Sequence, residues 1–346
     1  MKKSVLGLAL AALIILGAGA ALAADDPNFT IGEVENLLYG ELRTGSLVER
    51  INAVERELFG RELPGSVADR QVALLNFITK GAVQQPSMFF KLGVAEWVLS
   101  QKIDPFMPVV RRVERLEIQL DGTPQVDRPV AMRLERVLGL LVGDGVPMEE
   151  QDLAAGTVLR ASTYEAISPT NVKEGDVIRM NLESTVKVGT SLVAPRGSIV
   201  EAVVTKVTKP RSFGRPGEVQ FAVNKLIPLG PEEIALTVGQ RAEAAMKAES
   251  AQLAAAGTSL VGLVLLGPVG LVGGFLVRGD VKEIPAGAVT FAETASAMRV
   301  SAYPVPESLQ SLLAQEDPVI VPEPGADQGE QKKDTPSEPV HRGEGY

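Results

Sequence analysis

Side chains of the types that usually carry out catalysis or bind metals are scarce in this sequence. There is no cysteine, and the one histidine, His341, lies in a polar segment close to the C-terminus. These facts argue against a thiol nucleophile, histidine acid–base catalysis, and metal sites built from cysteine or several histidines. Carboxylates are abundant, but no pair stands out from the charges expected on helix faces. We therefore predict no catalytic, cofactor-binding or metal-binding residues, with a carboxylate-dependent glycan hydrolase as the alternative of another class.

One basic cluster has the charge to bind an anion. Residues 206–224 read as a β-hairpin whose tip carries Lys209, Arg211 and Arg215 around Phe213. These three cations could contact a phosphate or a lipid headgroup. The alternative interpretation, which the sequence favours, is a solvated hairpin tip without a ligand.

The N-terminus has the organisation of a secretory signal peptide. Lys2 and Lys3 precede an apolar stretch at residues 5–20, which is followed by Ala-Leu-Ala at residues 21–23. This order predicts cleavage after Ala23, with an uncleaved membrane anchor as the alternative. We therefore expect an exported protein of the periplasm or cell envelope, associated with a membrane.

Net charge and cysteine content restrict the partners and the core. The formal net charge is −9, and it becomes −11 when the two lysines of the signal peptide are removed. An acidic chain argues against nucleic acid as a partner. Because no disulfide can form, burial alone must hold any core together.

The longest apolar segment lies in the middle of the chain. Residues 258–277 read TSLVGLVLLGPVGLVGGFLV, with five glycines, one proline and no charge. About 20 such residues can cross a bilayer, and the small residues are spaced so that apolar helices can approach closely. The adjacent glycine and proline at 267–268 can break the run into two halves. We expect contacts with a membrane or a second protomer to involve Gly262, Gly267, Pro268, Gly270 and Gly274.

Three arrangements of this segment compete. A hairpin of two short helices could dip into one leaflet or pack within an oligomer, and it would leave the flanking β-domain intact. A single span would make the chain a type I membrane protein with a periplasmic binding module, and Arg278 and Lys282 would be cytoplasmic. The third arrangement is a hairpin buried in the protein's own core. The sequence favours the first, so we predict membrane association or self-association through residues 258–277.

The N-terminal half contains an internal repeat with an offset of twenty residues. Residues 34–40 (VENLLYG) match residues 54–60 (VERELFG), and residues 45–50 (GSLVER) match residues 65–70 (GSVADR). A looser copy covers residues 109–142. A fixed period of this length indicates repeated supersecondary units. We predict short helices joined by short loops, which would contact an envelope protein partner.

Each unit carries signals for both ends of a helix. Ser46 and Ser66 are predicted N-caps, and Glu49 can complete a capping box with the first of them. Gly60 is predicted to end a helix in the left-handed conformation. A further apolar helix surrounds Trp97, which we expect in the core.

This pattern resembles the short Val-Glu-x-x-Leu-Phe-Gly helical repeats, with Gly-Ser-Leu-x-x-Arg linkers, of exported bacterial proteins of unknown function. The resemblance covers residues 31–80 and, more loosely, 109–142. It implies an envelope location and no particular activity. The alternative is a plain helical bundle whose arginines and glutamates are solvated.

From residue 153 the apolar periodicity changes to two, which predicts β-strands. One turn phrase, with a glycine before a small residue and a strand, occurs three times, at residues 153–157, 193–198 and 284–288. The glycine supplies a backbone conformation that other residues disfavour. The third copy follows the apolar run and precedes a predicted strand at 289–294. Residues 258–277 are therefore predicted to interrupt one β-domain rather than to end it.

The C-terminal half is similar to the barrel domain in the core complex of type IV secretion systems. The matching residues are 153–160, 192–204 and the strand after Gly217. In that family a small β-barrel carries an inserted helical hairpin that reaches into the outer membrane. The resemblance implies the same arrangement for this chain.

Together these features predict an α+β protein. A short-helix repeat domain would precede a small antiparallel β-barrel or sandwich with an inserted apolar helical hairpin. The predicted boundaries are a signal peptide at 1–23, the helical domain at 24–148, the β-domain at 149–302 with the insertion at 240–279, and a disordered tail at 303–346. We expect a non-enzymatic cell-envelope protein with a structural or assembly role.

Overall fold

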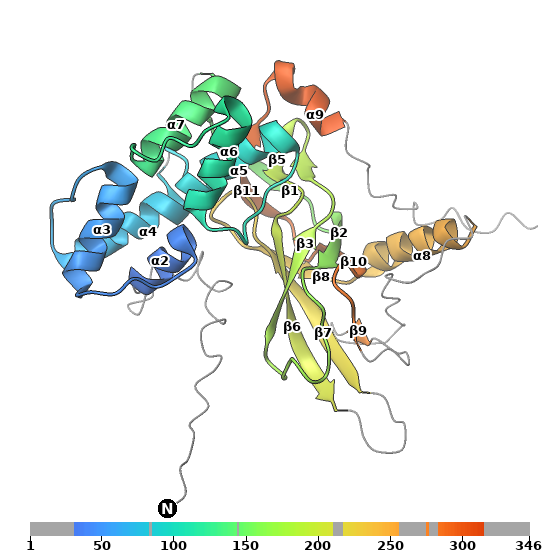
Figure 1. Cartoon of the computed structure of the whole chain (residues 1–346). Coiled ribbons are helices and arrows are strands. Elements are labelled where there is room, and N and C mark those ends of the chain that lie inside the picture. The colour runs from blue at the N-terminus through green and yellow to red at the C-terminus, as the bar shows by residue number, and fades with distance from the viewer. Residues whose placement is uncertain are drawn as a thin grey trace, which may run out of the picture.

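Helices come first in the chain and antiparallel strands follow, which makes the protein an α+β fold (Figure 1). The computed structural model describes residues 31–82, 85–143, 145–209, 217–255, 275–276 and 283–314. The predicted signal peptide lies outside these residues, as do the apolar run apart from residues 275 and 276 and the tail beyond residue 314.

The helical part consists of short elements joined by short loops. Its elements are α2 (Ile31–Tyr39), α3 (Leu47–Phe59), α4 (Val67–Leu75), a π-helical turn η1 (Asn76–Lys80), α5 (Met88–Ser100), α6 (Val109–Asp121) and α7 (Val130–Leu141). Their apolar faces form one cluster, in which Trp97 is 0% exposed, as the sequence predicted.

The ends of α3 and the start of α4 are fixed by the predicted cap residues. Ser46 Oγ accepts the Glu49 N–H, and the Glu49 carboxylate accepts the Ser46 N–H at 2.9 Å. Ser66 and Asp69 make the same reciprocal pair before α4. Two of the backbone donors that a helix start leaves free are satisfied in this way. Gly60 ends α3 with φ +72°, so its predicted left-handed conformation is confirmed.

A glutamate on one helix is buried and bound by an arginine from the following helix. The described chain contains four such pairs: Glu35 with Arg50, Glu55 with Arg70, Glu96 with Arg112, and Glu117 with Arg133. Each carboxylate also accepts a backbone N–H from the intervening loop, donated by Arg43, Leu63, Asp104 and Gln125 respectively. The plain-bundle alternative, with solvated glutamates and arginines, is therefore wrong for these glutamates.

Hydrogen bonding keeps the buried Glu35 carboxylate charged. Burial alone would raise the pKa of Glu35, but the hydrogen bonds from the Arg50 side chain and the Arg43 N–H lower that pKa below its usual value. In the most buried pair, Arg133 Nη2 lies 2.6 Å from Glu117 Oε2, and the two side chains are 1% and 0% exposed. Each ion pair links two helices and the loop between them.

The first helices of the helical part contact the last ones where a glycine meets a proline. Helices α6 and α7 follow Pro108 and Pro129, where α3 and α4 follow serines. A Cβ atom on Gly40 would lie 2.8 Å from Pro108 Cγ, and one on Gly60 would lie 2.8 Å from Pro129 Cγ. Glycine is thus required at both positions for its backbone conformation and for the close approach of the proline ring.

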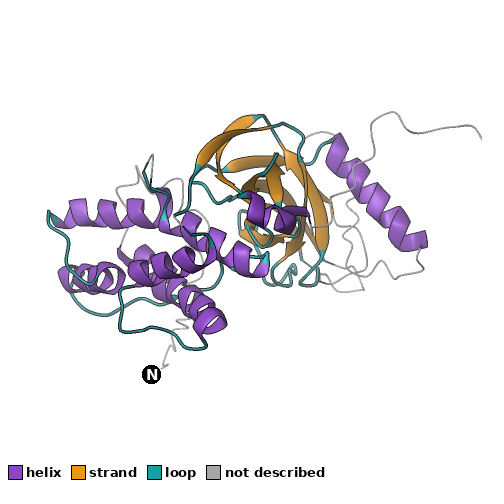
Figure 2. Cartoon of the chain, turned by 90° about the horizontal axis from the view of Figure 1, so that it is seen from above, coloured by secondary structure: helices purple, strands orange, loops and turns teal. Residues whose placement is uncertain are grey.

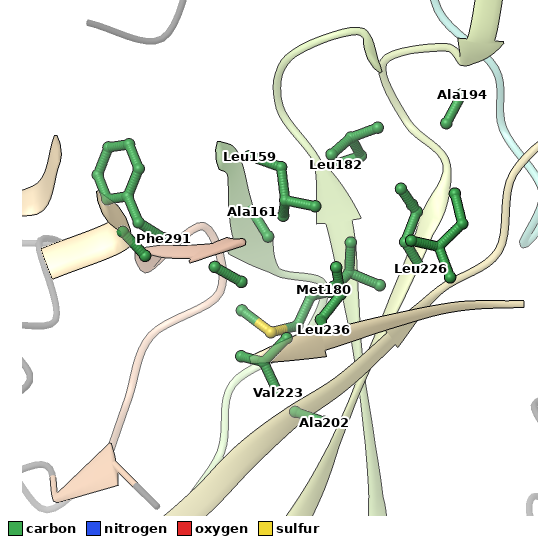
Figure 3. Close-up of a cluster of buried hydrophobic side chains, with 14 of the residues drawn as sticks. Leu159, Ala161, Met180, Leu182, Ala194, Ala202, Val223, Leu226, Leu236 and Phe291 are labelled. Carbon is green, nitrogen blue, oxygen red and sulfur yellow. The ribbon is translucent and has the colours of Figure 1, made fainter. Parts of the chain in front are cut away.

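Six antiparallel strands close into a barrel. In order around the barrel they are β2 (Val158–Thr163), β3 (Val177–Leu182), β6 (Ile199–Thr208), β7 (Glu218–Leu226), β8 (Ile234–Thr237) and β10 (Val289–Thr294), which returns to β2. Closure removes the unpaired edges of the sheet. Alternate residues of these strands form a buried cluster that includes Leu159, Met180, Val223, Leu236 and Phe291 (Figure 3).

A second, four-stranded sheet connects the barrel with the helices. Its strands are β1 (Glu149–Leu153), β11 (Met298–Pro304), β5 (Ser191–Ala194) and β4 (Val186–Val188), in that order. The Tyr303 ring of β11 makes an edge contact with Trp97, with centroids 6.5 Å apart. The chain continues into η2 (Glu307–Leu309) and α9 (Gln310–Ala314), where Leu313 is buried in the helical cluster. Regular structure therefore extends past residue 303, where the tail was predicted to begin.

The three predicted turn phrases share one conformation. Gly156, Gly197 and Gly287 have φ values of +72°, +89° and +80°. The N–H of each glycine donates to the carbonyl of the last residue of a neighbouring strand: Thr294 of β10, Leu182 of β3 and Thr163 of β2, respectively. Each turn therefore extends the hydrogen-bond ladder between the strand that follows it and the neighbour of that strand in the barrel.

We predict that Gly60→Ala destabilises the helical part more than Gly122→Ala does. Both glycines end a helix at positive φ, which costs a residue with a side chain about 1–2 kcal/mol. A methyl group on Gly60 would also collide with Pro129, whereas no described residue lies within 4 Å of a Cβ on Gly122. Urea unfolding followed by the fluorescence of Trp97, the only tryptophan, measures both costs. Equal costs would show that the proline contact is unimportant.

A second prediction concerns the buried ion pairs. Glu117→Gln should lower the free energy of unfolding by about 3–5 kcal/mol, because Arg133 would remain charged, buried and uncompensated. Glu114→Gln is the matched control on the same helix, since it removes a pair with Arg111, whose side chain is 71% exposed. That substitution should cost less than about 1 kcal/mol. The same urea titration applies, and a small cost for Glu117→Gln would refute the structural importance of the pair.

Candidate functional site

The chain leaves the barrel after β8 and returns to it at β10, so the predicted insertion lies between two strands of one barrel. β10 pairs with β2 from Val289 opposite Ser162 to Glu293 opposite Val158. It also pairs with β8, where Thr294 lies opposite Leu236. The predicted strand at 289–294 is confirmed with its bounds. Both ends of the insertion are therefore attached to strands of the same closed barrel.

Helix α8 (Gln240–Ala255) begins the insertion and is fixed to β2 and β10. Ala242, Ala245 and Met246 are buried against the apolar cluster of the barrel. Glu293 Oε2 accepts the Ala242 N–H at 2.8 Å, which places a carboxylate at the positive end of the helix dipole. About two and a half turns from its start, Glu249 pairs with Arg160 of β2 at 3.0 Å. The direction of α8 is thus set by contacts along its length.

The views in Figures 1 and 2 agree on where α8 points. The helix extends from the barrel on the side opposite to helices α2–α7. Within the described ranges, no helix combines the length and the apolar character that a bilayer crossing requires. The described elements of the insertion, α8 and the short strand β9 (Phe275–Leu276), form the insertion base.

The end of the apolar run forms a strand. Phe275 and Leu276 make up β9, whose backbone pairs with Phe221 and Gln220 of β7. The predicted helical hairpin is wrong for these two residues. The physical reason is that β8 is shorter than β7 and pairs only with Lys225 and Leu226, which leaves backbone groups of β7 open to β9.

The returning chain is fixed just before β10. Ile284 and Ile167 exchange two backbone hydrogen bonds of 2.7 and 2.8 Å. Thr163 Oγ1 donates to the Pro285 carbonyl at 2.7 Å. Together with α8 and β9, this bridge attaches the insertion to the barrel at three places.

The structure places few of the predicted contact residues. Gly262, Gly267, Pro268, Gly270 and Gly274 lie outside the described residues, as do Arg211 and Arg215. The pairing of β6 with β7, which extends to Thr208 opposite Glu218, confirms the predicted hairpin, whose tip lies outside the described residues. Lys209 follows the end of β6 and is exposed to solvent.

One cluster of titratable groups on the barrel was not found from the sequence. Lys225 Nζ of β7 lies 3.4 Å from Glu201 Oε2 of β6 and 2.6 Å from Glu233 Oε1. Glu201 is 3% exposed, and no described residue donates to its Oε1. Burial outweighs the attraction of Lys225 and raises the pKa of Glu201. The β6–β7 register sets Glu201 opposite Lys225, and this register cannot be read from spacing in one strand.

The arrangement of this cluster differs from the one that a glycan hydrolase requires. Such an enzyme needs two carboxylates on either side of a sugar bond, with one of them protonated. Here a lysine lies between the two carboxylates and contacts both of them. Among the described residues, no three histidine, cysteine, aspartate or glutamate side chains gather in a way that could hold a metal ion.

Comparisons with protein-family models, with curated proteins and with solved structures gave no match to this chain. The candidate site therefore rests on the geometry of the insertion base.

We predict that Glu201→Gln flattens the pH dependence of barrel stability. Because its folded-state pKa is raised, Glu201 keeps its proton in the folded chain at pH values where the unfolded chain has lost it. Stability therefore falls as the pH rises above the usual glutamate value, and it levels off above the folded-state pKa. The glutamine variant should match the parent near pH 4.5 and melt at a higher temperature at neutral pH. Glu165→Gln, an exposed control on the barrel, should follow the parent throughout; a variant that melts lower than the parent at neutral pH would contradict the assignment.

Proposed function

We propose that this chain is a non-enzymatic component of the cell envelope, in which a β-barrel presents an apolar segment to a membrane or to other protomers. The observation that carries the proposal is that the insertion leaves and re-enters one closed barrel at β8 and β10. An apolar run of twenty residues attached in this way is available to an external apolar environment.

The pairing of β10 weighs against a type I protein with a single span. One crossing of a bilayer would leave residues 255 and 283 on opposite sides of the membrane. The described contacts attach the segments before and after the run to the same strand, β2. Arg160 of β2 pairs with Glu249 of α8, and β2 also pairs with β10. A dipping or oligomer-forming hairpin satisfies these attachments without separating the strands.

The filled barrel interior weighs against burial of the run in its own core. The strands supply their own apolar cluster, in which Met180 and Phe291 are 0% and 3% exposed (Figure 3). Protein interiors are close-packed and do not accept an additional segment of this size. The direction of α8, away from the helices, also supports an external destination.

The helices would serve as a rigid surface for an envelope protein partner. The buried ion pairs hold successive helices at defined positions, which supports the proposed repeat organisation. Several large apolar side chains on this part are exposed: Leu42, Leu47, Val48, Val72, Ile118, Val126, Met132 and Leu140. Export through the N-terminal signal sequence, with cleavage after Ala23, completes the proposal.

The decisive experiment removes residues 258–274 and joins the ends with a short Gly-Ser linker, leaving α8 and β9 in place. Circular dichroism and thermal melting should show a folded barrel. Flotation with liposomes and light scattering should show loss of membrane binding or of the oligomer. A triple Lys209, Arg211 and Arg215 to Ser variant is the matched control, and it should float like the parent because it keeps the apolar run.

Three outcomes would overturn the proposal. An unfolded deletion variant would make the run part of the core. If the deletion variant floats with liposomes and has the same oligomer mass as the parent, the run contacts neither a membrane nor a second protomer. Protease protection of tags after residues 255 and 283 would establish a span if the tags lie on opposite sides of the membrane.

A further inference from the structure

One loop of the helical part docks on one glycine turn of the barrel. The loop after α5 places Ile103 against the turn of Pro195, Arg196 and Gly197, and the Ile103 N–H donates to the Arg196 carbonyl at 2.9 Å. Ile103 is 8% exposed. A Cβ atom on Gly197 would lie 2.1 Å from the Ile103 carbonyl oxygen, so only glycine permits this approach. The contact thus combines a buried aliphatic side chain, a backbone hydrogen bond and a glycine that has no Cβ atom to block the approach.

The loop after α2 is the structural counterpart of the loop after α5. In the first, the Arg43 N–H donates to Glu35, and in the second the Asp104 N–H donates to Glu96, eight residues apart in each case. This register makes Leu42 the counterpart of Ile103. Leu42 is 66% exposed, and no hydrogen bond is made by its N–H within the described chain.

The other two loops lack this pair of features. In the loop that follows Glu55, the residue equivalent to Leu42 and Ile103 is Glu62. In the loop that follows Glu117, it is Pro124. Glu62 is exposed and paired with Arg56, and Pro124 has no N–H to donate. Leu42 is therefore the one further position of this kind, among the four loops, that could make the contact of Ile103.

The barrel carries a counterpart of the docked turn as well. Pro285, Ala286 and Gly287 repeat Pro195, Arg196 and Gly197, and the glycine φ values are +80° and +89°. Both turns close with a hydrogen bond from the residue after the glycine to the proline carbonyl, at 3.3 and 3.1 Å. The backbone surfaces of the two turns are thus alike.

The counterpart turn is open. Among the described residues, nothing lies within 4 Å of a Cβ position on Gly287 and no donor reaches the Ala286 carbonyl. Pro285, Ala286 and Gly287 are all exposed. At the third turn, by contrast, the Arg241 side chain lies 3.2 Å from a Cβ position on Gly156.

We infer that Leu42 of one copy of this chain docks on the Ala286–Gly287 turn of a second copy, in the way that Ile103 docks on Arg196 and Gly197 within the chain. The occupant is a second copy because both halves of the contact are present on the same chain and neither is occupied by a described residue of that chain. Leu47 and Val48, exposed on the first turn of α3, extend the apolar surface around Leu42. The two patches differ, so the contact is heterologous and would build a ring or a filament.

The absence of native cysteine permits a direct test with the full chain. A Leu42→Cys variant is mixed with an Ala286→Cys variant and oxidised mildly. The internal contact brings Ile103 and Arg196 within backbone hydrogen-bond distance, which suits the Cα separation of about 4.4–6.8 Å that disulfides bridge. The expected result is a disulfide-linked dimer that contains one chain of each variant.

Two control pairs keep the result interpretable. Glu62→Cys replaces the equivalent residue of the next loop, and its mixture with Ala286→Cys should lose the dimer. An Ile103→Cys, Arg196→Cys double variant should form its disulfide within one chain, which establishes that oxidation works at this geometry. A Leu42→Asp variant without cysteine should reduce the oligomer mass measured by light scattering, relative to the parent.

The outcomes separate this inference from the proposed role of the apolar run. Absence of the mixed dimer while the internal disulfide forms would overturn the inference, as would equal cross-linking through residue 62. Neither result affects liposome flotation, which reports on the apolar run. If the variant lacking residues 258–274 no longer floats but its Leu42→Cys and Ala286→Cys forms still cross-link, the two contacts are independent and both proposals are supported.

Discussion

The closure of the barrel by β10 is the constraint on which the arrangement of the insertion depends. β10 is the last barrel strand in the chain, and it pairs on both sides with strands that precede the apolar run. Removing β10 would expose two edges of a small sheet, which is costly because the backbone groups of both neighbours would lose their partners. Whatever the apolar run contacts, it must do so as a loop that returns to its starting point. A type I span would instead require the two ends of the run to lie on opposite sides of a membrane.

Buried charge gives the helical part its defined geometry. Moving an arginine and a glutamate out of water is unfavourable, and a buried pair adds stability only when its remaining hydrogen-bonding groups are satisfied. Here each carboxylate accepts hydrogen bonds from an arginine and from a loop N–H, so each pair ties two helices and their loop together. The arginine and the loop N–H can both reach the carboxylate only when the two helices and the loop are correctly placed.

Local signals could be read from the sequence, whereas contacts between distant segments could not. The caps at Ser46, Ser66 and Gly60 depend on residues within a few positions, and the turn glycines depend on their own φ. The strand β10 was found because its turn repeats two others. The acidic strand Glu149–Leu153 was missed because its only buried residue is Leu153 and its stability comes from pairing with β11. The pairing of Glu35 with Arg50 was missed because a buried and a solvated glutamate have the same spacing on a helix. The apolar run was found from composition, and its residues up to 274 lie outside the described residues.

The helical part and the insertion are mechanically connected through the barrel. Ile103 and Trp97 hold the helices against Arg196 and Tyr303 on one side, while α8 is held by Glu293 and Arg160 on the other. Because the barrel is closed and its interior is filled, a displacement at one side cannot be absorbed by an open sheet edge or an empty cavity. A partner bound to the helices would therefore be held in a fixed orientation relative to α8. This connection is consistent with the proposed assembly role, since positioning neighbours requires rigidity between contact surfaces.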